Sequence, residues 1–166
     1  MGMCSGELRH YIIRPSLKHI GMWSLAGENL LLGTAACESG LGTHIKFQNH
    51  QSLGLYQISP KMHKNIWDNF LAPQPELSSK VRGLASQREF LAHPHYELVT
   101  NLSYSSVIAW LIYYRTGCNV KKITPGDILG LGKLWHKYFH NHHRPSSPQY
   151  FVSCYHQLIS VPETTL

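Results

Sequence analysis

The sequence VIAWLIYY at residues 107–114 is the feature that most restricts how this chain folds. Its apolar residues would surround a helix on every side, and such a helix lies at the centre of a protein. The segment is too short to cross a bilayer, which takes about 20 apolar residues. The pattern therefore predicts a central helix in a mostly helical domain, with little or no β structure and no stable membrane insertion.

The composition fits one packed domain. The chain has 166 residues, of which 43% are hydrophobic and 14% charged, and this balance argues against disorder. A chain of this length favours a single domain. We expect an N-terminal arm over residues 1–20 and one domain over 21–166.

Capping residues define the other helices. Ser24 and Gly40 suit the start and the stop of a helix over 24–37, and Ser59 followed by Pro60 suits the start of the next one. Ser103 or Ser105 would cap the central helix, and Thr124 would cap a later one. Further helices are expected over 60–70, 76–92, 103–117, 125–143 and 149–159, with a little β structure near 53–58.

Glu38 stands at the tail of the apolar helix over 24–37. The helix dipole is negative at that end, and apolar neighbours withhold water. Both effects would raise the pKa of the carboxyl group. A glutamic acid that stays protonated near neutral pH is the general acid needed to cleave a glycosidic bond. A surface glutamate that merely ends a helix is the other interpretation.

Two linked motifs bear on this choice. ESGLG begins at Glu38, SLGLYQI begins at Ser52, and Gln57 follows Glu38 by 19 residues. In this order and spacing the pair resembles the soluble lytic transglycosylase family, whose fold is lysozyme-like. The resemblance is strong over residues 30–60 and diffuse over 24–140. Tyr56 stands where that family often has methionine.

The resemblance implies a role for each matching residue. Glu38 would be the catalytic acid and base, Ser39 would fix the helix end, and the Gln57 amide would lie near the acid or the sugar. The residues expected to bind substrate are Ser39, Ser52, Gly54, Tyr56, Gln57, Tyr138 and Asn141. The last two stand for a Tyr-Asn pair of the family and match it loosely; Tyr113 and Tyr114 are alternatives for the tyrosine.

The number of acids separates two reactions. Glycosidases of the lysozyme kind generally use two carboxylates, and the segment 39–67 contains none. A lytic transglycosylase needs one acid, because the 6-hydroxyl of the sugar closes an anhydro ring. Hydrolysis stays open, since another acid could fold back toward the site; the candidates are Asp68, Glu76, Glu89, Glu97 and Asp127. A non-catalytic structural or adaptor protein of a phage tail is the third alternative.

No metal or cofactor is expected. The cysteines at 4, 37, 118 and 154 are too widely spaced for a zinc ribbon or a redox motif, and their disulfide state stays open. His136 and His140 have a spacing that can bind zinc. However, neither a glutamate in the zincin position nor a cysteine accompanies them.

The net charge of +6 suits an anionic partner or simply favours solubility. No nucleic-acid-binding motif is evident, so nucleic acid is not expected as a partner. The expected partners are peptidoglycan glycan strands and the tail or baseplate proteins of a phage. Because no secretory signal is visible, we expect a virion protein made in the cytoplasm and acting in the periplasm or wall. A holin-released endolysin and a secretion-system cargo are the alternatives.

Overall fold

The computed structural model describes residues 2–46, 51–139 and 146–159. These residues are mostly helical, as predicted, and they contain no β-sheet. The β structure expected near 53–58 is a single antiparallel bridge between Leu53 and Ile58.

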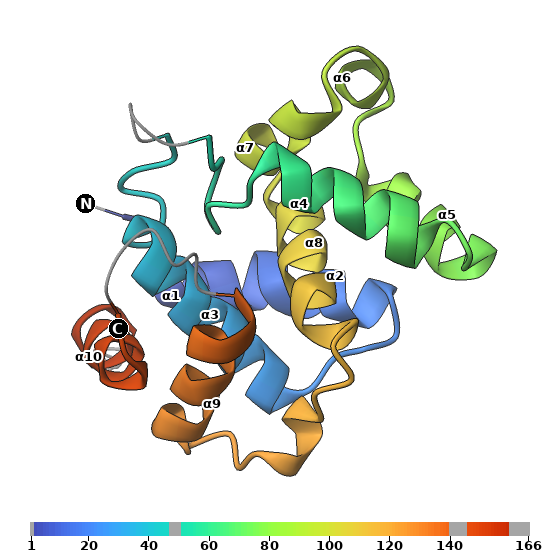
Figure 1. Ribbon diagram of the computed structural model, residues 1–166. Helices are drawn as coiled ribbons and strands as arrows, with labels where there is room; N and C mark the ends of the chain where they lie inside the picture. Colours follow the sequence, from blue (N-terminus) through green and yellow to red (C-terminus); the bar gives the residue numbers. More distant parts are fainter. Residues whose placement is uncertain (1, 47–50, 140–145, 160–166) are drawn as a thin grey trace.

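The predicted central helix is α8, Leu102–Tyr114. All of its residues from 104 to 113 are buried, and Figure 1 shows it running between the upper and the lower helices. The cap is Asn101, whose side chain accepts a hydrogen bond from the Tyr104 backbone N–H at 3.0 Å. The serine caps predicted at 103 and 105 are therefore wrong, because the helix starts before either residue.

The N-terminal residues belong to the core rather than to an arm. α1 (Ser5–Glu7), the π-helical η1 (Leu8–Ile13) and α2 (Arg14–His19) follow one another without a break. Leu8, Ile13 and Leu17 are buried, and this helical segment packs against α3 and α8. Its apolar side chains lie about one turn apart, so they line one face.

Helix α3, Leu25–Ser39, lies beside α8 and is buried from Ala26 onward. The Ser24 hydroxyl accepts a hydrogen bond from the Gly27 backbone N–H at 3.0 Å, which confirms the predicted cap. At the other end Gly40 adopts the left-handed conformation with φ of 59°. Glycine reaches this conformation at low cost, so the predicted stop is also confirmed.

The segment after α3 leads to the helices of the upper part of Figure 1. α4 (Pro60–Asn65) continues as η2 (Ile66–Leu71), and the Ser59 cap is confirmed by its hydrogen bond from the Met62 N–H at 3.1 Å. The single helix predicted over 76–92 is two helices, α5 (Pro75–Leu84) and α6 (Gln87–Ala92).

The division falls at Ser86. Its hydroxyl accepts from the Glu89 N–H at 3.0 Å and so caps α6, while its own N–H donates to the buried Glu97 carboxylate at 3.1 Å. The predicted break at 93–95 is confirmed: η3 (Pro94–Tyr96) and α7 (Glu97–Thr100) follow.

The last elements pack on α3 and α8. They are η4 (Val120–Lys122), α9 (Ile128–Leu134), η5 (Trp135–Phe139) and α10 (Pro148–Leu158). The cap of α9 is Asp127, which accepts from the Gly130 N–H at 3.0 Å, and not Thr124 as predicted. The Pro125 carbonyl instead accepts from the Asn29 side chain at 2.9 Å, which keeps this residue in the turn before the helix.

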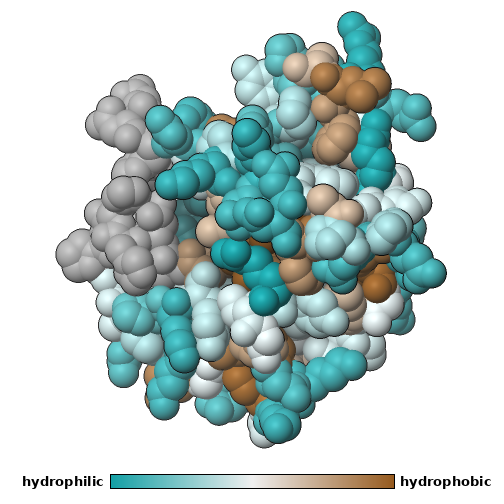
Figure 2. Space-filling view, turned by 45° about the vertical axis from the view of Figure 1, so that its right-hand side comes forward, coloured by the Kyte–Doolittle hydropathy of each residue, from teal (hydrophilic) through white to brown (hydrophobic). Residues whose placement is uncertain are grey.

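One face of the molecule is largely polar. The face in Figure 2 is largely hydrophilic, with hydrophobic side chains in small separate patches. Within the described ranges, the helices are all too short or too polar to cross a membrane.

Candidate active site

Glu38 is buried in the last turn of α3. Only 4% of the residue is exposed, and the Trp135 indole N–H donates a hydrogen bond to its Oε1 at 2.9 Å. Trp135 is itself buried and comes from η5, 97 positions later in the chain. The tertiary fold thus supplies the donor that holds this carboxylate.

Thr34 and Tyr113 lie next to Glu38. Thr34 precedes Glu38 by one helical turn and shares its face of α3. The hydroxyl groups of Thr34 and Tyr113 are 2.7 Å apart. Burial raises the pKa of Tyr113 well above its ordinary value, and the charge of Glu38 adds to this effect. The tyrosine hydroxyl is therefore a neutral group close to the carboxyl group.

Ser39 attaches the following segment to the end of α3. Its hydroxyl donates to the Leu55 carbonyl at 2.6 Å and accepts from the Gly42 N–H at 2.9 Å. The predicted role of Ser39 in fixing the helix end is confirmed. These bonds hold the 53–58 turn against the residue that follows Glu38.

The 53–58 turn is stabilised from within by Gln57. This residue is buried, with a φ of 51°, and its side-chain N–H donates to the carbonyls of Gly54 at 2.9 Å and Ile45 at 3.1 Å. A contact of the Gln57 amide with substrate stays a prediction.

The fold itself requires glycine at position 54. Its φ is 80°, and a Cβ atom at this position would overlap the backbone carbonyl of Leu98 in α7. The absence of a side chain at position 54 thus lets the protein backbone approach closely, and substrate binding by Gly54 stays a prediction.

The two tyrosines predicted to bind sugar differ in exposure. Tyr56 is fully buried and its hydroxyl lies 2.7 Å from the Ser106 hydroxyl, so its ring has no open face to present to a sugar. The prediction for Tyr56 is therefore corrected to a core role. Tyr138 is half-buried, with the Lys137 ammonium 5.0 Å from its ring centre.

Two further predicted residues complete the list. Ser52 is buried, with 8% exposed. Asn141 lies outside the described residues. Binding of substrate by Ser52 and Asn141 stays a prediction.

The candidates for a second carboxylate lie in other surroundings. Both Glu97 oxygens accept hydrogen bonds within the α6–α8 region, from Ser86 and Asn101, and Asp127 caps α9. Asp68 and Glu76 are exposed, and Glu89 is half-buried on α6.

A second buried acid, Glu28, lies at the other end of α3. Its Oε1 accepts from Arg9 at 2.7 Å and from Arg14 at 2.8 Å, and its Oε2 accepts from Trp23 at 2.7 Å. Burial by itself would raise the pKa of Glu28, but the hydrogen bonds from Arg14, Trp23 and Arg9 outweigh it and the pKa is lowered. Glu28 is thus an ionised group that joins α3 to the N-terminal helical segment.

α4 carries a buried histidine, His63, that faces η3. His63 Nδ1 is 2.8 Å from His95 Nδ1, and His63 Nε2 is 2.6 Å from the Tyr104 hydroxyl, which also accepts from Trp67 at 2.8 Å. Burial lowers the pKa of His63 to about 4, with a further contribution from His95. His63 is therefore neutral at physiological pH.

No cluster of three or more His, Cys, Asp or Glu side chains suited to a metal ion occurs within residues 2–46, 51–139 and 146–159. His136 Nε2 lies 3.0 Å from the Ser146 carbonyl oxygen. His140 lies outside these ranges. All four cysteines are thiols in the structure.

Sequence reasoning missed Trp135 and Thr34, and it named Tyr113 only as an alternative to Tyr138. Trp135 lies within the helix predicted over 125–143, but nothing in the local pattern marks its N–H as a donor to Glu38. The spacing of Thr34 and Glu38 by four residues was the available signal, since it places them on one face.

The chain was compared with family models, curated proteins and solved structures. No family model, curated protein or solved structure matches it.

Proposed function

We propose that this protein is a peptidoglycan lytic transglycosylase with a lysozyme-like fold. It would cleave the β-1,4 bond between N-acetylmuramic acid and N-acetylglucosamine. The proposal rests on one observation: Glu38 is a buried carboxyl group at a helix end, held by Trp135, with the 53–58 turn fixed beside it through Ser39. The motif resemblance supplies the reaction.

Glu38 would act twice in the reaction. The protonated carboxyl group gives its proton to the glycosidic oxygen as the bond to C1 of N-acetylmuramic acid breaks. The carboxylate then takes the proton of the 6-hydroxyl as that oxygen bonds to C1. The product has a 1,6-anhydro ring, no water is consumed, and Glu38 ends protonated as it began.

The surroundings of Glu38 suit this cycle. The Trp135 N–H is a neutral donor that can hold the carboxylate after the first step without forming an ion pair. Tyr113 lies close by as a neutral hydroxyl, and its stacking on Phe139, with ring centres 5.2 Å apart, fixes its position.

Three of the other acids are engaged elsewhere in the protein, which favours one carboxylate over two. Glu97 accepts a hydrogen bond from the Ser86 N–H, Asp127 from the Gly130 N–H, and Glu28 from Arg9. A hydrolase of the lysozyme kind would need one of the remaining acids to reach the scissile bond. Hydrolysis is therefore the second candidate, and its product distinguishes it.

The setting is part of the proposal. As expected from the sequence, the protein would be delivered by a phage particle, at its tail or baseplate. The net charge of +6 suits binding to the anionic bacterial wall. Binding to purified sacculi should weaken as salt is raised, because exposed charges are screened.

Product analysis tests the reaction. Purified sacculi are incubated with the protein, and the released muropeptides are identified by mass spectrometry. We expect 1,6-anhydro ends from the wild type and a loss of about 10²–10⁴-fold in rate for Glu38→Gln. Asp68→Asn, which removes an exposed acid, is the matched control and should keep full activity.

Three results would count against the proposal. Reducing ends in place of anhydro ends would establish a hydrolase. Full activity of Glu38→Gln would remove Glu38 from the reaction. Binding to sacculi without release of any muropeptide would favour a structural or adaptor protein.

A further inference from the structure

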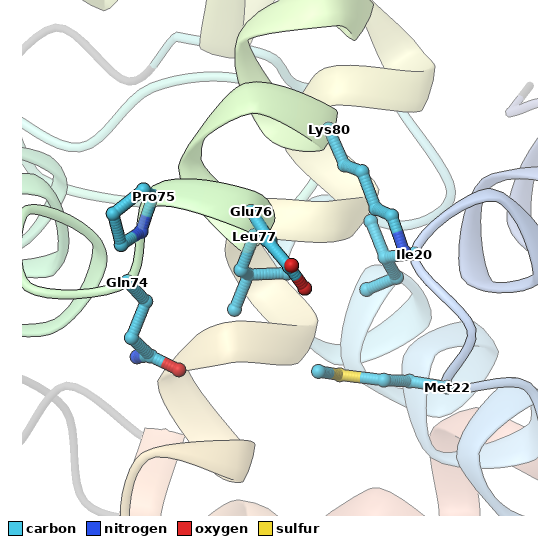
Figure 3. A pocket seen from close by; sticks show the side chains of 7 residues that line it. All are labelled: Ile20, Met22, Gln74, Pro75, Glu76, Leu77 and Lys80. Atoms are coloured by element: carbon cyan, nitrogen blue, oxygen red, sulfur yellow. The ribbon is translucent and has the colours of Figure 1, made fainter.

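A pocket of about 650 Å³ lies between the end of α2 and the start of α5. Its lining residues are Ile20, Met22, Gln74, Pro75, Glu76, Leu77 and Lys80. Figure 3 shows the apolar side chains of Ile20, Met22 and Leu77 around the space, with the Glu76 carboxylate turned into it.

Two opposite charges on this pocket are available to a ligand. Glu76 and Lys80 lie four residues apart on α5, a spacing at which glutamate and lysine commonly pair. Here the two ion pairs found among the described residues both involve Glu28, so Glu76 and Lys80 form no ion pair with each other. Both residues are exposed. The pocket therefore offers the Glu76 carboxylate to a cationic group of a ligand and the Lys80 ammonium to an anionic group.

Gln74 adds a neutral polar group. Its side-chain N–H donates to the Phe70 carbonyl at 2.6 Å, which fixes the amide. The amide oxygen faces the pocket in Figure 3 and can accept from a ligand N–H.

Contacts across the pocket hold its walls in place. His19 Nε2 lies 3.0 Å from the Lys80 carbonyl oxygen, which joins the end of α2 to α5. The Trp110 indole N–H donates to the Met22 sulfur at 3.4 Å, which joins the other wall to α8. The pocket is thus formed before a ligand arrives.

The pocket is remote from Glu38 along α3. Met22 precedes the first residue of α3, whereas Glu38 lies in its last turn. A helix of 15 residues is about 22 Å long, which is the length of several sugar units. A ligand in the pocket therefore does not occupy the position of the scissile bond.

We propose that this pocket binds a short peptide that bears both a free ammonium group and a free carboxylate. Glu76 takes the ammonium group, Lys80 takes the carboxylate, Gln74 accepts a peptide N–H, and Ile20, Met22 and Leu77 receive small apolar side chains. Resting on the proposed function, the peptide is the stem of the wall substrate, which carries both charges and alanine methyl groups. The pocket would then hold substrate that is cleaved at Glu38.

Calorimetric titration tests the proposal. The wild-type protein is titrated with the free stem tetrapeptide L-Ala-γ-D-Glu-meso-diaminopimelyl-D-Ala, which has no glycosidic bond to cleave. We expect binding, and a loss of about fivefold in affinity for Glu76→Gln and for Lys80→Met. The matched controls Glu89→Gln and Lys133→Met change charges outside the pocket and should bind as the wild type does.

A second ligand and an activity assay separate this inference from the proposed function. The same proteins are titrated with the disaccharide that lacks the peptide. Glu76→Gln and the wild type should bind this disaccharide with equal affinity. Absence of peptide binding, or equal binding by both pocket variants and the wild type, would overturn the inference. Peptide binding by a protein that releases no anhydro product would support the pocket and overturn the proposed function.

Discussion

Glu28 and Glu38 are two buried acids on one helix, and their partners make them different groups. Their exposed fractions are 0% and 4%, and they stand ten residues apart on α3. Glu28 accepts from two arginines and a tryptophan, whereas Glu38 accepts from the neutral Trp135 N–H. Residue type and burial are nearly the same, so it is the bonds from the arginines and Trp23 that make Glu28 an ionised, structural group.

The ends of the helix reinforce this difference. Glu28 lies in the first turn of α3, where the dipole favours negative charge, and Glu38 lies in the last turn, where it does not. The charge of Glu28 is thus stabilised in the folded state. At the position of Glu38 the dipole of α3 instead disfavours a permanent negative charge.

The largest effect should come from Glu28→Gln. This change leaves Arg9 and Arg14, which are partly exposed, without their carboxylate. A hydrogen bond to a charged group contributes about 1.5–3 kcal/mol, and several are lost at once. The free energy of unfolding is measured by urea denaturation. Glu76→Gln, at an exposed site, should change it by less than about 0.5 kcal/mol. A cost below about 1 kcal/mol for Glu28→Gln would remove the contrast with Glu38.

Glu28 and the buried histidine, His63, should lose their contributions to stability in different pH ranges. The folded-state pKa of His63 is about 4 against an ordinary 6.5, so the unfolded chain binds the proton first as pH falls. Stability should therefore drop by up to about 3 kcal/mol between pH 6.5 and 4. The contribution of Glu28, whose pKa is lowered from 4.5, is lost at still lower pH.

Urea denaturation from pH 7.5 to 3 measures both contributions. His63→Asn should remove the loss between pH 6.5 and 4, and Glu28→Gln should leave that loss in place. Exposed His156, changed to asparagine, is the control and should leave the profile unaltered. An unchanged profile for His63→Asn would show that another group titrates in this range.

Trp135→Phe tests the partner of Glu38. The variant keeps a buried ring but leaves the carboxyl group without its indole donor, which costs about 1–3 kcal/mol. The pH dependence of wall cleavage should shift as well. Trp110→Phe removes a longer hydrogen bond to sulfur and should leave the pH–rate profile unchanged. Identical profiles for both variants would show that Trp135 does not act on Glu38.

The smallest effect is expected for Ser39→Ala. It removes the hydrogen bond to the Leu55 carbonyl and should cost about 1 kcal/mol, measured by urea denaturation. Ser153→Ala, on the exposed face of α10, is the control. If the two variants are equally stable, the attachment of the 53–58 turn to α3 does not depend on Ser39.

Local signals predicted the parts of the fold that local interactions determine. Ser24, Gly40 and Ser59 act within one turn of their helices, and their roles were readable from the sequence. The caps at Ser86 and Asp127 are equally local but were missed, because each competes with another plausible start in the same stretch. The contact of Asn29 with the Pro125 carbonyl, 96 residues away, could not be read from the local pattern.

The candidate site divides in the same way. Glu38, Ser39 and Gln57 belong to one segment, and the structure brings Ser39 against the turn that contains Gln57. Trp135 is 97 residues from Glu38, so its donor role depends on how η5 packs against α3. The prediction that Tyr56 binds sugar was wrong, because the sequence pattern cannot tell which side of a tight turn faces the core.

The overlap that any side chain at position 54 would make with Leu98 also guides protein engineering. A library intended to alter ligand preference should keep glycine at this position, since every replacement would force the turn away from α7 and disturb Leu55, the anchor of Ser39. Variation is better introduced at Gln51, an exposed residue two positions before this turn.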